Sequence, residues 1–313
     1  GLSTGSYYVI VTDVNGCTAL PTPTNAVIIV NPTPDIDITV SGANPICVGQ
    51  ASELFFPVIS GTPPFNVSYF AGTVSLSADI DAFGNLLSSS APMTLNPNVT
   101  TTYSLVSVID AKGCSNSLSE SATVTVNEIP SVIVSGSTEI CNQENTPLYF
   151  DFTAGSAPWT VAYTINGVPT ALTLSNSSDS VIVNPSVTTK YIFTNIDDGK
   201  CSAIVSDEVT IDVNPLPQAI ISGGGSVCDD GSTIEVKIVT TSGTPNYNIY
   251  FSAGINNLTA QNVGANYTLN ASEAGTYILT RVTDSKGCEA QSLNGSATVV
   301  INEFPEVAIT AYP

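Results

Sequence analysis

Residues 284–288 read Asp-Ser-Lys-Gly-Cys, and near copies of this stretch recur as DVNGC from Asp13, DAKGC from Asp110 and DDGKC from Asp197. An Asp followed three residues later by a Gly favours a type I turn, with Asp at its first position and Gly at its fourth. In the copy from Asp197 the Gly comes one residue earlier, so we expect that turn to be shifted by one residue. Four copies in a chain of 313 residues indicate an internal repeat.

Two further sequence markers keep the same phase as this turn. An Asn-x-x-Pro signal recurs at nearly equal intervals, beginning at Asn31, Asn127, Asn214 and Asn302. A glycine followed by proline and an aromatic residue, or a near variant, occurs as GTPPF from Gly61, GSAPW from Gly155 and GTPNY from Gly243. Three independent markers in one phase establish a repeat of about 90 residues.

Each repeat shows the period of antiparallel β-strands. Its second and last strands alternate apolar and polar residues, as half-buried strands do. No stretch carries a 3.6-residue apolar period over ten residues, and 23 Gly and 20 Pro interrupt the chain. About seven short strands per repeat predict an all-β fold of immunoglobulin-like sandwiches. The residues expected to face the cores are Leu54, Phe56, Val58, Ala122, Val124, Val126, Leu148, Phe150, Phe152, Val209, Ile211, Val213, Ile234, Val236, Ile238, Ala297, Val299 and Ile301.

The markers divide the chain into a partial repeat, three full repeats and the start of another. We place the C-terminal half of an immunoglobulin-like domain at 1–31, full domains at 32–128, 129–214 and 215–302, and the first strand of a further domain at 303–313. The connectors are a few residues long and each contains a Pro, which fixes φ and removes a donor. We therefore expect stiff connections, and domains arranged end to end as a rod.

The composition argues against several classes of function. The chain has six basic and 26 acidic residues, a formal net charge of −20 and no His. A nucleic-acid binder needs Lys and Arg to neutralise phosphates, so we expect no nucleic-acid partner. Without His, and without a Ser or Lys in a recognised catalytic motif, we expect no enzymatic activity and no cofactor. The longest aliphatic run, at 26–30, is too short to cross a bilayer, so no membrane insertion is expected in this segment.

The seven cysteines follow the repeat. Each full repeat has one cysteine after its first strand and one after its last turn, at similar intervals in all three. We predict one disulfide per repeat, namely Cys47–Cys114, Cys141–Cys201 and Cys228–Cys288, and hence an oxidising, extracytoplasmic compartment. A thiolate metal site would need a CxxC or Cys/His cluster that the sequence lacks. Cys17 matches the later cysteine of each repeat, so we expect its partner before Gly1, in a longer chain of which this is a section.

Acidic residues offer only weak candidates for a metal site. The segment 79–85, with Asp79, Asp81 and Gly84, resembles part of a calcium loop but lacks the third acid and the closing Glu. A solvated loop is therefore the expected interpretation, with Ca²⁺ as the alternative. Asp35 and Asp37 alternate with isoleucines and are expected on the outer face of a strand, whereas Asp229 and Asp230 belong to a Gly-rich turn.

Aromatic residues fit structural roles. Trp159 could stack on a sugar ring, but it takes the position of Phe65 and Tyr247 in the other repeats, so we expect core packing. A tyrosine lies at a nearly constant distance before the later cysteine of each repeat and fits a tyrosine corner. These tyrosines are Tyr103, Tyr191 and Tyr277.

Four stretches carry a resemblance to a known family, namely GLSTGSYYVIVTDVNGCT from Gly1, GTPPFNVSY from Gly61, LNPNVTTTYSLVSVIDAKGC from Leu95 and AGTYILTRVTDSKGCE from Ala274. They resemble the tandem PKD-like and gliding-adhesin-type repeats of giant cell-surface proteins of Bacteroidota. That resemblance implies export by the type IX secretion system, a link to gliding motility, cell-surface attachment and a role as adhesin or stalk. Asp179-Ser180-Val181 also resembles the O-glycosylation site of those bacteria, which implies modification of Ser180.

The expected function is structural. We expect a section of a stalk or filament in a large secreted cell-surface adhesin. Its partners would be neighbouring domains of the same chain and a surface or glycan ligand that the sequence does not identify. Lateral assembly could occur through the edge strands of the sandwiches. One alternative is a self-assembling filament subunit, in which a neighbour completes 1–31 by β-strand addition. The single strand at 306–312 cannot replace the roughly five strands that 1–31 lacks. Another alternative is a set of accessory domains beside a secreted polysaccharide-degrading enzyme.

Overall fold

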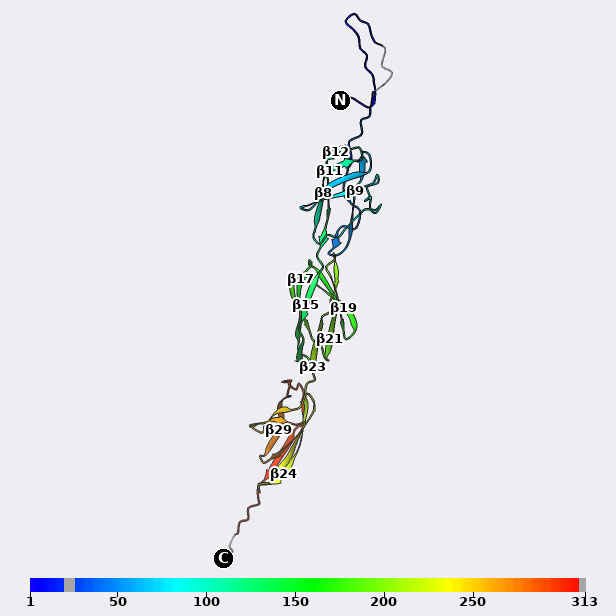
Figure 1. Cartoon of the computed structure of the whole chain (residues 1–313). Coiled ribbons are helices and arrows are strands. Elements are labelled where there is room, and N and C mark those ends of the chain that lie inside the picture. Colours follow the sequence, from blue (N-terminus) through cyan, green and yellow to red (C-terminus); the bar gives the residue numbers. More distant parts are fainter. Residues whose placement is uncertain (20–25, 310–313) are drawn as a thin grey trace. The chain divides into compact units, whose positions relative to one another are not determined.

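The computed structural model describes residues 1–19 and 26–309, and this part of the chain consists of strands and loops with no helix (Figure 1). The predicted all-β fold is therefore confirmed, and no helix in the described ranges is long and apolar enough to span a membrane. The chain divides into two compact units, 1–129 and 130–313. Among the described residues there are three separate hydrophobic cores, which lie within 32–128, 129–214 and 215–302.

The second full repeat is a sandwich of two sheets. One sheet has the order β15-β17-β20, with antiparallel neighbours, and the other has the order β16-β23-β21-β18-β19, with β22 paired to β21. This division into two facing sheets is that of an immunoglobulin-like domain. The strands are β15 (Ser131–Ser135), β16 (Thr138–Cys141), β17 (Thr146–Ala154), β18 (Trp159–Ile165), β19 (Val168–Leu174), β20 (Ser178–Val183), β21 (Thr189–Asp197), β22 (Ser202–Ile204) and β23 (Glu208–Asn214).

The first full repeat has the same plan in shorter pieces. Its larger sheet has the order β12-β11-β8-β9, with β13 also paired to β11, and the opposite side consists of β10-β6-β4 and β3-β7. The strands are β3 (Asp35–Ile36), β4 (Thr39–Val40), β5 (Ile46–Cys47), β6 (Ser52–Phe55), β7 (Val58–Ser60), β8 (Phe65–Ala71), β9 (Val74–Ile80), β10 (Met93–Leu95), β11 (Thr101–Asp110), β12 (Ser115–Ser117), β13 (Ser121–Val124) and β14 (Val126–Asn127).

In the third full repeat one long strand serves both layers. The first half of β24 pairs with β25, and its second half pairs with β31. The change occurs near Gly224, which has φ +83° and whose added Cβ would lie 2.3 Å from the carbonyl oxygen of Thr298, so only glycine fits there. The strands are β24 (Gln218–Cys228), β25 (Ile234–Ser242), β26 (Tyr247–Ala253), β27 (Asn256–Val263), β28 (Asn266–Ala271), β29 (Gly275–Thr283), β30 (Leu293–Asn294) and β31 (Ala297–Asn302).

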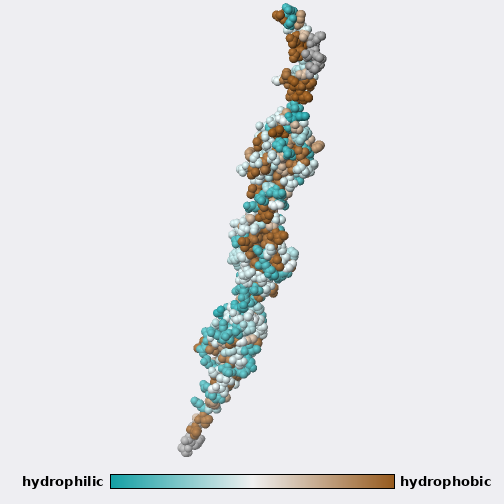
Figure 2. All heavy atoms as spheres, viewed as in Figure 1, coloured by the Kyte–Doolittle hydropathy of each residue, from teal (hydrophilic) through white to brown (hydrophobic). Residues whose placement is uncertain are grey.

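The described residues outside these repeats, 1–19, 26–31 and 303–309, form little structure of their own. Before the first full repeat, β1 (Gly5–Tyr7) pairs with β2 (Ala26–Ile28). Apolar side chains of this segment are exposed, Val9 by 68% and Ile29 by 70%, and Figure 2 shows brown spheres gathered over it. No strand forms in 303–309, where we expected one, because no partner strand lies beside this segment in the described chain; the rest of that expected strand, 310–313, lies outside the described residues.

Burial follows the predicted alternation along the strands. The residues expected to face the cores are buried or partly exposed, and none of them is fully exposed. The buried ones are Leu54, Phe56, Val124, Leu148, Phe150, Phe152, Val209, Ile211, Val236, Ile238, Ala297 and Val299. The partly exposed ones are Val58, Ala122, Val126, Val213, Ile234 and Ile301.

One parallel pairing recurs in every full repeat. The strand that carries the earlier cysteine runs beside the last strand, so that Cys47 pairs with Asn127, Cys141 with Asn214 and Cys228 with Asn302. These asparagines begin the Asn-x-x-Pro signals. The earlier cysteine of each repeat therefore lies at the end where the chain leaves that repeat, which we call the downstream end.

Replacing Phe150 by Ala tests this core. Phe150 is fully buried and packs edge-on against Phe193 at 5.7 Å between ring centroids, so Phe150→Ala should lower the unfolding free energy by about 3–5 kcal/mol. The matched control is Tyr149→Ala, because Tyr149 is 49% exposed on the other face of the same strand. Scanning calorimetry should show a clear loss for the first variant and little change for the second. Equal losses would contradict the predicted alternation.

Candidate functional site

A buried carboxylate organises the end of each repeat at which the chain enters, which we call the upstream end. In the third repeat Asp284 is 3% exposed. Its Oδ1 accepts hydrogen bonds from the backbone N–H of Lys286 (3.0 Å) and of Cys288 (2.9 Å). Its Oδ2 accepts a third bond, from the backbone N–H of Thr244 (2.8 Å). One side chain thus ties the turn with the later cysteine to the corner that precedes β26.

The other full repeats contain the same arrangement. Asp110 accepts hydrogen bonds from the N–H of Lys112, Cys114 and Thr62 at 2.9–3.1 Å. In the second repeat the acceptor is Asp198, three residues before its cysteine, and it bonds the N–H of Lys200, Cys201 and Ser156 at 2.8–3.0 Å. The one-residue shift predicted for this turn is confirmed.

The three sequence markers meet at this upstream end. Gly155 and Gly243 have φ +86° and +87°, and an added Cβ would lie 2.9 Å from Pro130 or Pro217, the prolines of the Asn-x-x-Pro signals. Both prolines are buried. From the sequence alone, the Asp of the turn next to the later cysteine was interpreted only as a turn residue. Its role as a hydrogen-bond acceptor for both the turn and the distant corner was missed. The signal was present, because the Asp keeps the same phase as the Gly and Pro markers.

Hydrogen bonding favours the ionised form of two of these carboxylates, Asp110 and Asp198. Burial alone would raise the pKa of Asp110 and of Asp198, because it penalises the charged form. The backbone N–H groups, that of the neighbouring cysteine first, outweigh this effect and hold each pKa below its ordinary value of 3.8. The turn therefore depends on a charged acceptor rather than a neutral one.

The earlier cysteine lies at the opposite end of its repeat. The N–H of Cys141 donates to Oε2 of Glu144 (2.8 Å), and the N–H of Cys47 donates to Oε1 of Gln50 (2.9 Å). Within the second repeat, the nine-residue strand β21 separates the downstream end from the turn that carries Cys201. At a rise of about 3.3 Å per residue such a strand is roughly 30 Å long, whereas the Cα atoms of a disulfide lie within about 7 Å.

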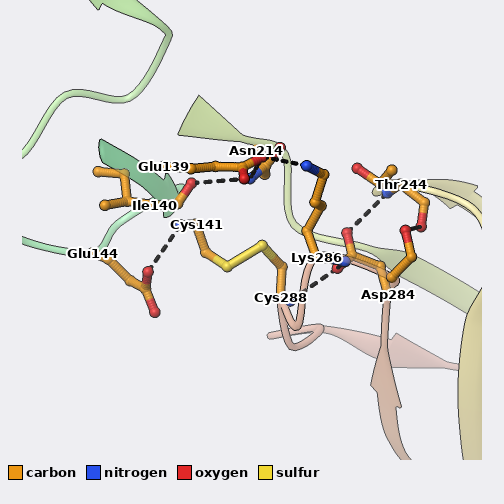
Figure 3. The surroundings of a disulfide bond; sticks show 10 residues. Glu139, Ile140, Cys141, Glu144, Asn214, Thr244, Asp284, Lys286 and Cys288 are labelled. Carbon is orange, nitrogen blue, oxygen red and sulfur yellow. Dashed lines mark hydrogen bonds and ion pairs between the residues drawn. A yellow bond between two sulfur atoms is a disulfide. The ribbon is translucent and has the colours of Figure 1, made fainter. Parts of the chain in front are cut away.

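The predicted disulfides within repeats are therefore wrong. Cys141 bonds to Cys288, with 5.5 Å between their Cα atoms, and not to Cys201 (Figure 3). Cys114 and Cys228 are free, which excludes the predicted pairs with Cys47 and Cys288. The two cysteines of each repeat do recur at similar sequence intervals. However, the strand that carries the earlier cysteine pairs in parallel with the last strand of the repeat, and this pairing places the earlier cysteine far from the turn that carries the later one.

The remaining cysteines are in two states. Cys47 and Cys201 are both disulfide-bonded. Cys17 is free and exposed, and its partner before Gly1 stays a prediction.

The bond between Cys141 and Cys288 joins the downstream end of the second repeat to the upstream end of the third. The strand β16 and the turn at 284–288 meet at this joint, across the linker 215–217. Figure 3 shows the two cysteines pointing toward each other between Glu144 on one side and the Asp284 turn on the other. We regard this joint as the candidate functional site.

Polar contacts surround the disulfide. Lys286 forms an ion pair of 2.7 Å with Glu139, which also accepts a hydrogen bond from the side-chain amide of Asn214 (3.0 Å) (Figure 3). Lys286 lowers the pKa of Glu139, and Glu139 raises the pKa of Lys286. The Lys286 side chain is 43% exposed and that of Glu139 46%, so solvent screens the pair and the disulfide dominates the joint.

A shallow hollow lies beside this joint. It has a volume of about 370 Å³, and two of its lining residues form a hydrogen bond across the joint, from Nε2 of Gln291 to Oε1 of Gln143. Its lining consists of polar side chains, prolines and Leu216, without a carboxylate or a cation. An adjoining hollow of about 450 Å³ includes the carboxylates of Glu144 and Glu289.

The candidate calcium loop is organised by its own backbone. Oδ1 of Asp81 accepts hydrogen bonds from the N–H of Phe83 (2.8 Å) and Asn85 (3.0 Å), and these bonds, Asn85 first, lower the pKa of Asp81. Asp79 accepts a bond from the side-chain amide of Asn66 (2.7 Å). The two acids thus point to separate partners, and no group of three or more metal-ligating side chains occurs in the part of the chain that the structure describes.

The other acidic candidates lie where the sequence predicts them. Asp35 and Asp37 are only partly exposed, between the buried Ile36 and Ile38, on the outer face of the first strand region. Asp229 and Asp230 are exposed in a turn, and Asp230 accepts a hydrogen bond from the N–H of Ser232 (2.9 Å).

The aromatic candidates are structural. Trp159 is 6% exposed and stacks on Phe152 at 4.4 Å between ring centroids, so its face is not open to a sugar. Phe65 and Tyr247, at the equivalent positions, are also buried. The hydroxyl of Tyr277 donates to the backbone carbonyl of Glu273 (3.0 Å), as in a tyrosine corner. Tyr103 and Tyr191 are buried, and burial raises the pKa of each.

Ser180 is an exposed residue of the edge strand β20. Its N–H donates to Oδ1 of the preceding Asp179 (2.8 Å), and Ser180 borders a hollow of about 400 Å³ together with Tyr149 and Asp151. The hydroxyl is therefore accessible to a modifying enzyme.

Comparisons with known proteins give distant similarities. No protein-family model matches the chain. Nucleoporin POM152 of Saccharomyces cerevisiae is 27% identical over 163 residues, which are 46% of this chain and only 12% of that protein. The ectodomain of mouse nectin-like molecule 4, with domains Ig1–Ig3, aligns at 14% identity and a TM-score of 0.39 over 86% of this chain and 100% of that one. Fibronectin(III)-like modules of Clostridium thermocellum CbhA align at 14% identity and a TM-score of 0.27, over 57% of this chain and 94% of that one.

Acid should weaken the upstream ends. Because the pKa values of Asp110 and Asp198 are lowered on folding, their stabilising effect is complete above about pH 4 and is lost as the pH falls through their folded-state values. Thermal unfolding should therefore move to lower temperature below that pH. At neutral pH, Asp198→Asn should lower the melting temperature by at least about 4 °C, the shift for 1 kcal/mol in a domain of this size.

The control for this prediction is Asp212→Asn, which changes an exposed carboxylate in the same repeat. Its melting temperature should stay near that of the parent chain. A melting temperature that is independent of pH between 5 and 2, or equal effects of the two variants, would contradict the role assigned to the buried carboxylates.

Proposed function

We propose that the chain is a non-catalytic structural section of an extracellular protein, in which immunoglobulin-like repeats form a stiff spacer. The observation that carries this proposal is the covalent joint between two repeats that have separate cores. A linker alone lets neighbouring domains pivot, whereas a peptide linker and a disulfide at the same joint restrict rotation. Restricted rotation of one repeat relative to the next stiffens a spacer, whereas binding modules that act independently do not require it.

The chemistry of the described residues supports the same proposal. The carboxylate of Asp284 is occupied by backbone hydrogen bonds, and the hollow lined by Gln143 and Gln291 at the joint has no carboxylate or cation among its lining side chains. Immunoglobulin-like domains with disulfides are typical of extracellular proteins, because an oxidising compartment is needed to keep the bonds. We therefore infer an extracellular location and no enzymatic activity in this segment.

The resemblance to gliding-adhesin-type repeats extends the proposal to the group of bacteria and to the cellular location of the protein. On that basis the chain is a stalk or filament section of a cell-surface adhesin of Bacteroidota, exported by the type IX system. The strongly acidic composition, with net charge −20, keeps such a surface soluble. Partners would be neighbouring repeats of the same chain, with any glycan or surface ligand bound elsewhere.

Distance measurements between spin labels test the stiff joint. Thioether-linked labels are placed at Tyr149→Cys and Ile278→Cys, exposed positions of the second and third repeats, with Cys17, Cys114 and Cys228 changed to Ser. We expect one narrow distance distribution in the oxidised chain. It should broaden when Cys141→Ser and Cys288→Ser are added, because only the linker and weak polar contacts then hold the joint.

The control pair lies within the third repeat, at Ile220→Cys and Ile278→Cys, and should stay narrow in both backgrounds. A broad distribution across the joint of the oxidised chain would refute the stiff spacer. Concentration-dependent sedimentation of the oxidised chain would instead favour the self-assembling subunit.

Modification of Ser180 is a separate proposal that rests on the motif and on the exposure of this residue. A peptide map of protein purified from its source should show a glycan mass on the peptide that contains Ser180. Ser178 is the internal control, because it is exposed on the same strand but lies outside the motif. An unmodified Ser180 in native material would refute the proposal.

A further inference from the structure

We propose that Sγ of Cys141 is a site of thiol–disulfide exchange, at which an uncharged or cationic thiol opens the joint between the second and third repeats. The site lies within the unit 130–313 and consists of the Cys141–Cys288 bond and the hollow of about 450 Å³ beside it. This exchange site goes beyond the proposed function, because it concerns how the joint is unlocked. A stiff joint that no thiol can reach would leave the spacer proposal standing.

The two cysteines of this bond differ in their access to solvent. Cys288 is completely buried, with 0% of its surface exposed. Cys141 is partly exposed, and it lines the hollow together with residues of both repeats. Thiol–disulfide exchange begins when a thiolate attacks one of the two sulfurs, and its rate depends on access to that sulfur. The hollow therefore directs the attack to Sγ of Cys141 and makes Cys288 the leaving group.

The turn that carries Cys288 is closed around its cysteine. The N–H of Cys288 donates to Oδ1 of Asp284 (2.9 Å), and Asp284 itself is 3% exposed. The other carboxylate oxygen of Asp284 holds the N–H of Thr244 (2.8 Å), so the turn is tied to a second segment of the repeat. Figure 3 shows this turn on the Cys288 side of the bond and Glu144 on the Cys141 side. Attack on Cys288 would require the turn to open, whereas attack on Cys141 would not.

The exchange is balanced with an external thiol as the reductant. The sulfur of its thiolate bonds to Sγ of Cys141, the Sγ–Sγ bond breaks, and the electron pair of that bond leaves on Cys288, which takes a proton from water. A second thiolate then attacks the sulfur of the bound thiol and releases Cys141 as a thiolate. Two thiols are thereby oxidised to one disulfide, and the two cysteines receive the two electrons. An excess of the oxidised thiol reverses both steps and restores the joint.

The carboxylates beside the hollow disfavour thiols with an additional negative charge. Glu144 and Glu289 both line the hollow, and Oε2 of Glu144 accepts the N–H of Cys141 at 2.8 Å. Glu289 is paired with Arg281 at 3.1 Å, whereas no ion pair of Glu144 occurs among the described residues. The charge of Glu144 is therefore not neutralised by a neighbouring cation. It repels an anionic thiol at low salt, and salt screens this repulsion.

Opening the bond frees the joint without unfolding the repeats, because the second and third repeats have separate hydrophobic cores. The other contacts described across the joint are the ion pair of Lys286 with Glu139 and the hydrogen bond of Gln291 with Gln143. All four side chains belong to exposed contacts, which contribute little to stability. The repeats of the reduced chain would then pivot about the linker 215–217.

A trapping experiment identifies the sulfur that is attacked. The free thiols of the unmodified chain are alkylated under native conditions, and the chain is treated briefly with 2-mercaptoethanol and quenched with acid, which protonates thiolates and stops the exchange. New thiols then receive a second label, and the chain is digested with pepsin at acid pH and mapped by mass spectrometry. We expect the mercaptoethanol adduct on Cys141 and the second label on Cys288. An adduct on Cys288, or no reaction at either cysteine while circular dichroism shows a folded chain, would overturn the proposal.

Thiols of different charge test the role of Glu144. The rate of opening is measured at low salt with cysteamine, 2-mercaptoethanol and 2-mercaptoethanesulfonate, each divided by the rate of the same thiol with bis(2-hydroxyethyl) disulfide. The relative rate should fall from the cationic to the neutral to the anionic thiol. Glu144→Gln should raise the relative rate of the anionic thiol by about twofold or more. Equal relative rates of the three thiols in the parent chain would overturn the proposal.

This substitution is compatible with the fold, because Gln50 takes the equivalent position in the first repeat and accepts the N–H of Cys47 at 2.9 Å. The matched control is Glu303→Gln, which changes an exposed carboxylate at the downstream end of the third repeat. Its three relative rates should equal those of the parent chain. An equal effect of the two substitutions would contradict the role assigned to Glu144.

Spin labels show whether the exchange opens the joint. The labels at Tyr149→Cys and Ile278→Cys are held by thioethers and therefore stay attached in the presence of 2-mercaptoethanol. The distance distribution should be narrow before the treatment and broad after it. A distribution that stays narrow after Cys141 has reacted would overturn the opening of the joint. A distribution that is already broad before the treatment would instead refute the stiff spacer, so the two failures are distinguishable.

Discussion

The buried carboxylate at the upstream end of each repeat is the interaction on which the rest of the structure depends. Asp284 accepts three backbone hydrogen bonds from two segments that are distant in sequence, the turn before Cys288 and the corner before β26. Gly243 packs between this carboxylate and Pro217, so the point at which the chain enters the repeat is held by the same group. One charged side chain thereby places the linker, the corner and the later cysteine relative to each other.

The second constraint is the parallel pairing of the earlier cysteine's strand with the last strand. Because the two strands run in the same direction, the cysteine ends beside the residue that begins the linker, as Cys141 does beside Asn214. With the later cysteine held at the opposite end, oxidation cannot close a loop within the repeat. The bond Cys141–Cys288 therefore connects two domains whose hydrophobic cores are separate.

This arrangement explains how small domains can act together without a large interface. The polar contacts at the joint, such as Lys286 with Glu139, are exposed and contribute little. Sandwich domains joined only by such contacts would move independently of each other. A covalent bond beside the linker supplies the restraint that the contact surface lacks. The proposed role as a stiff spacer follows from the bond and not from the fold, which many unrelated functions share.

Much of each repeat could be predicted from local patterns. The alternation that buries Phe150 and exposes Tyr149 is a property of neighbouring residues, and so is the shift of the turn at Asp198. The core position of Trp159 followed from its equivalence to Phe65 and Tyr247. The role of Asp284 as an acceptor for Thr244 was missed, since that bond joins residues far apart in sequence. The phase of the markers showed that these segments belong together but not how they touch.

The sequence by itself determined the repeat, the strands, the sandwich fold and the presence of two cysteines per full repeat, because periodicity and turn chemistry are local. Only the tertiary structure decided which cysteines meet. The sequence interval between Cys141 and Cys201 is equally compatible with a bond within the repeat and with none. The direction in which one short strand, β16, pairs with β23 excludes the first and brings Cys141 to Cys288. Strand direction depends on the whole sandwich, and for that reason no local pattern revealed it.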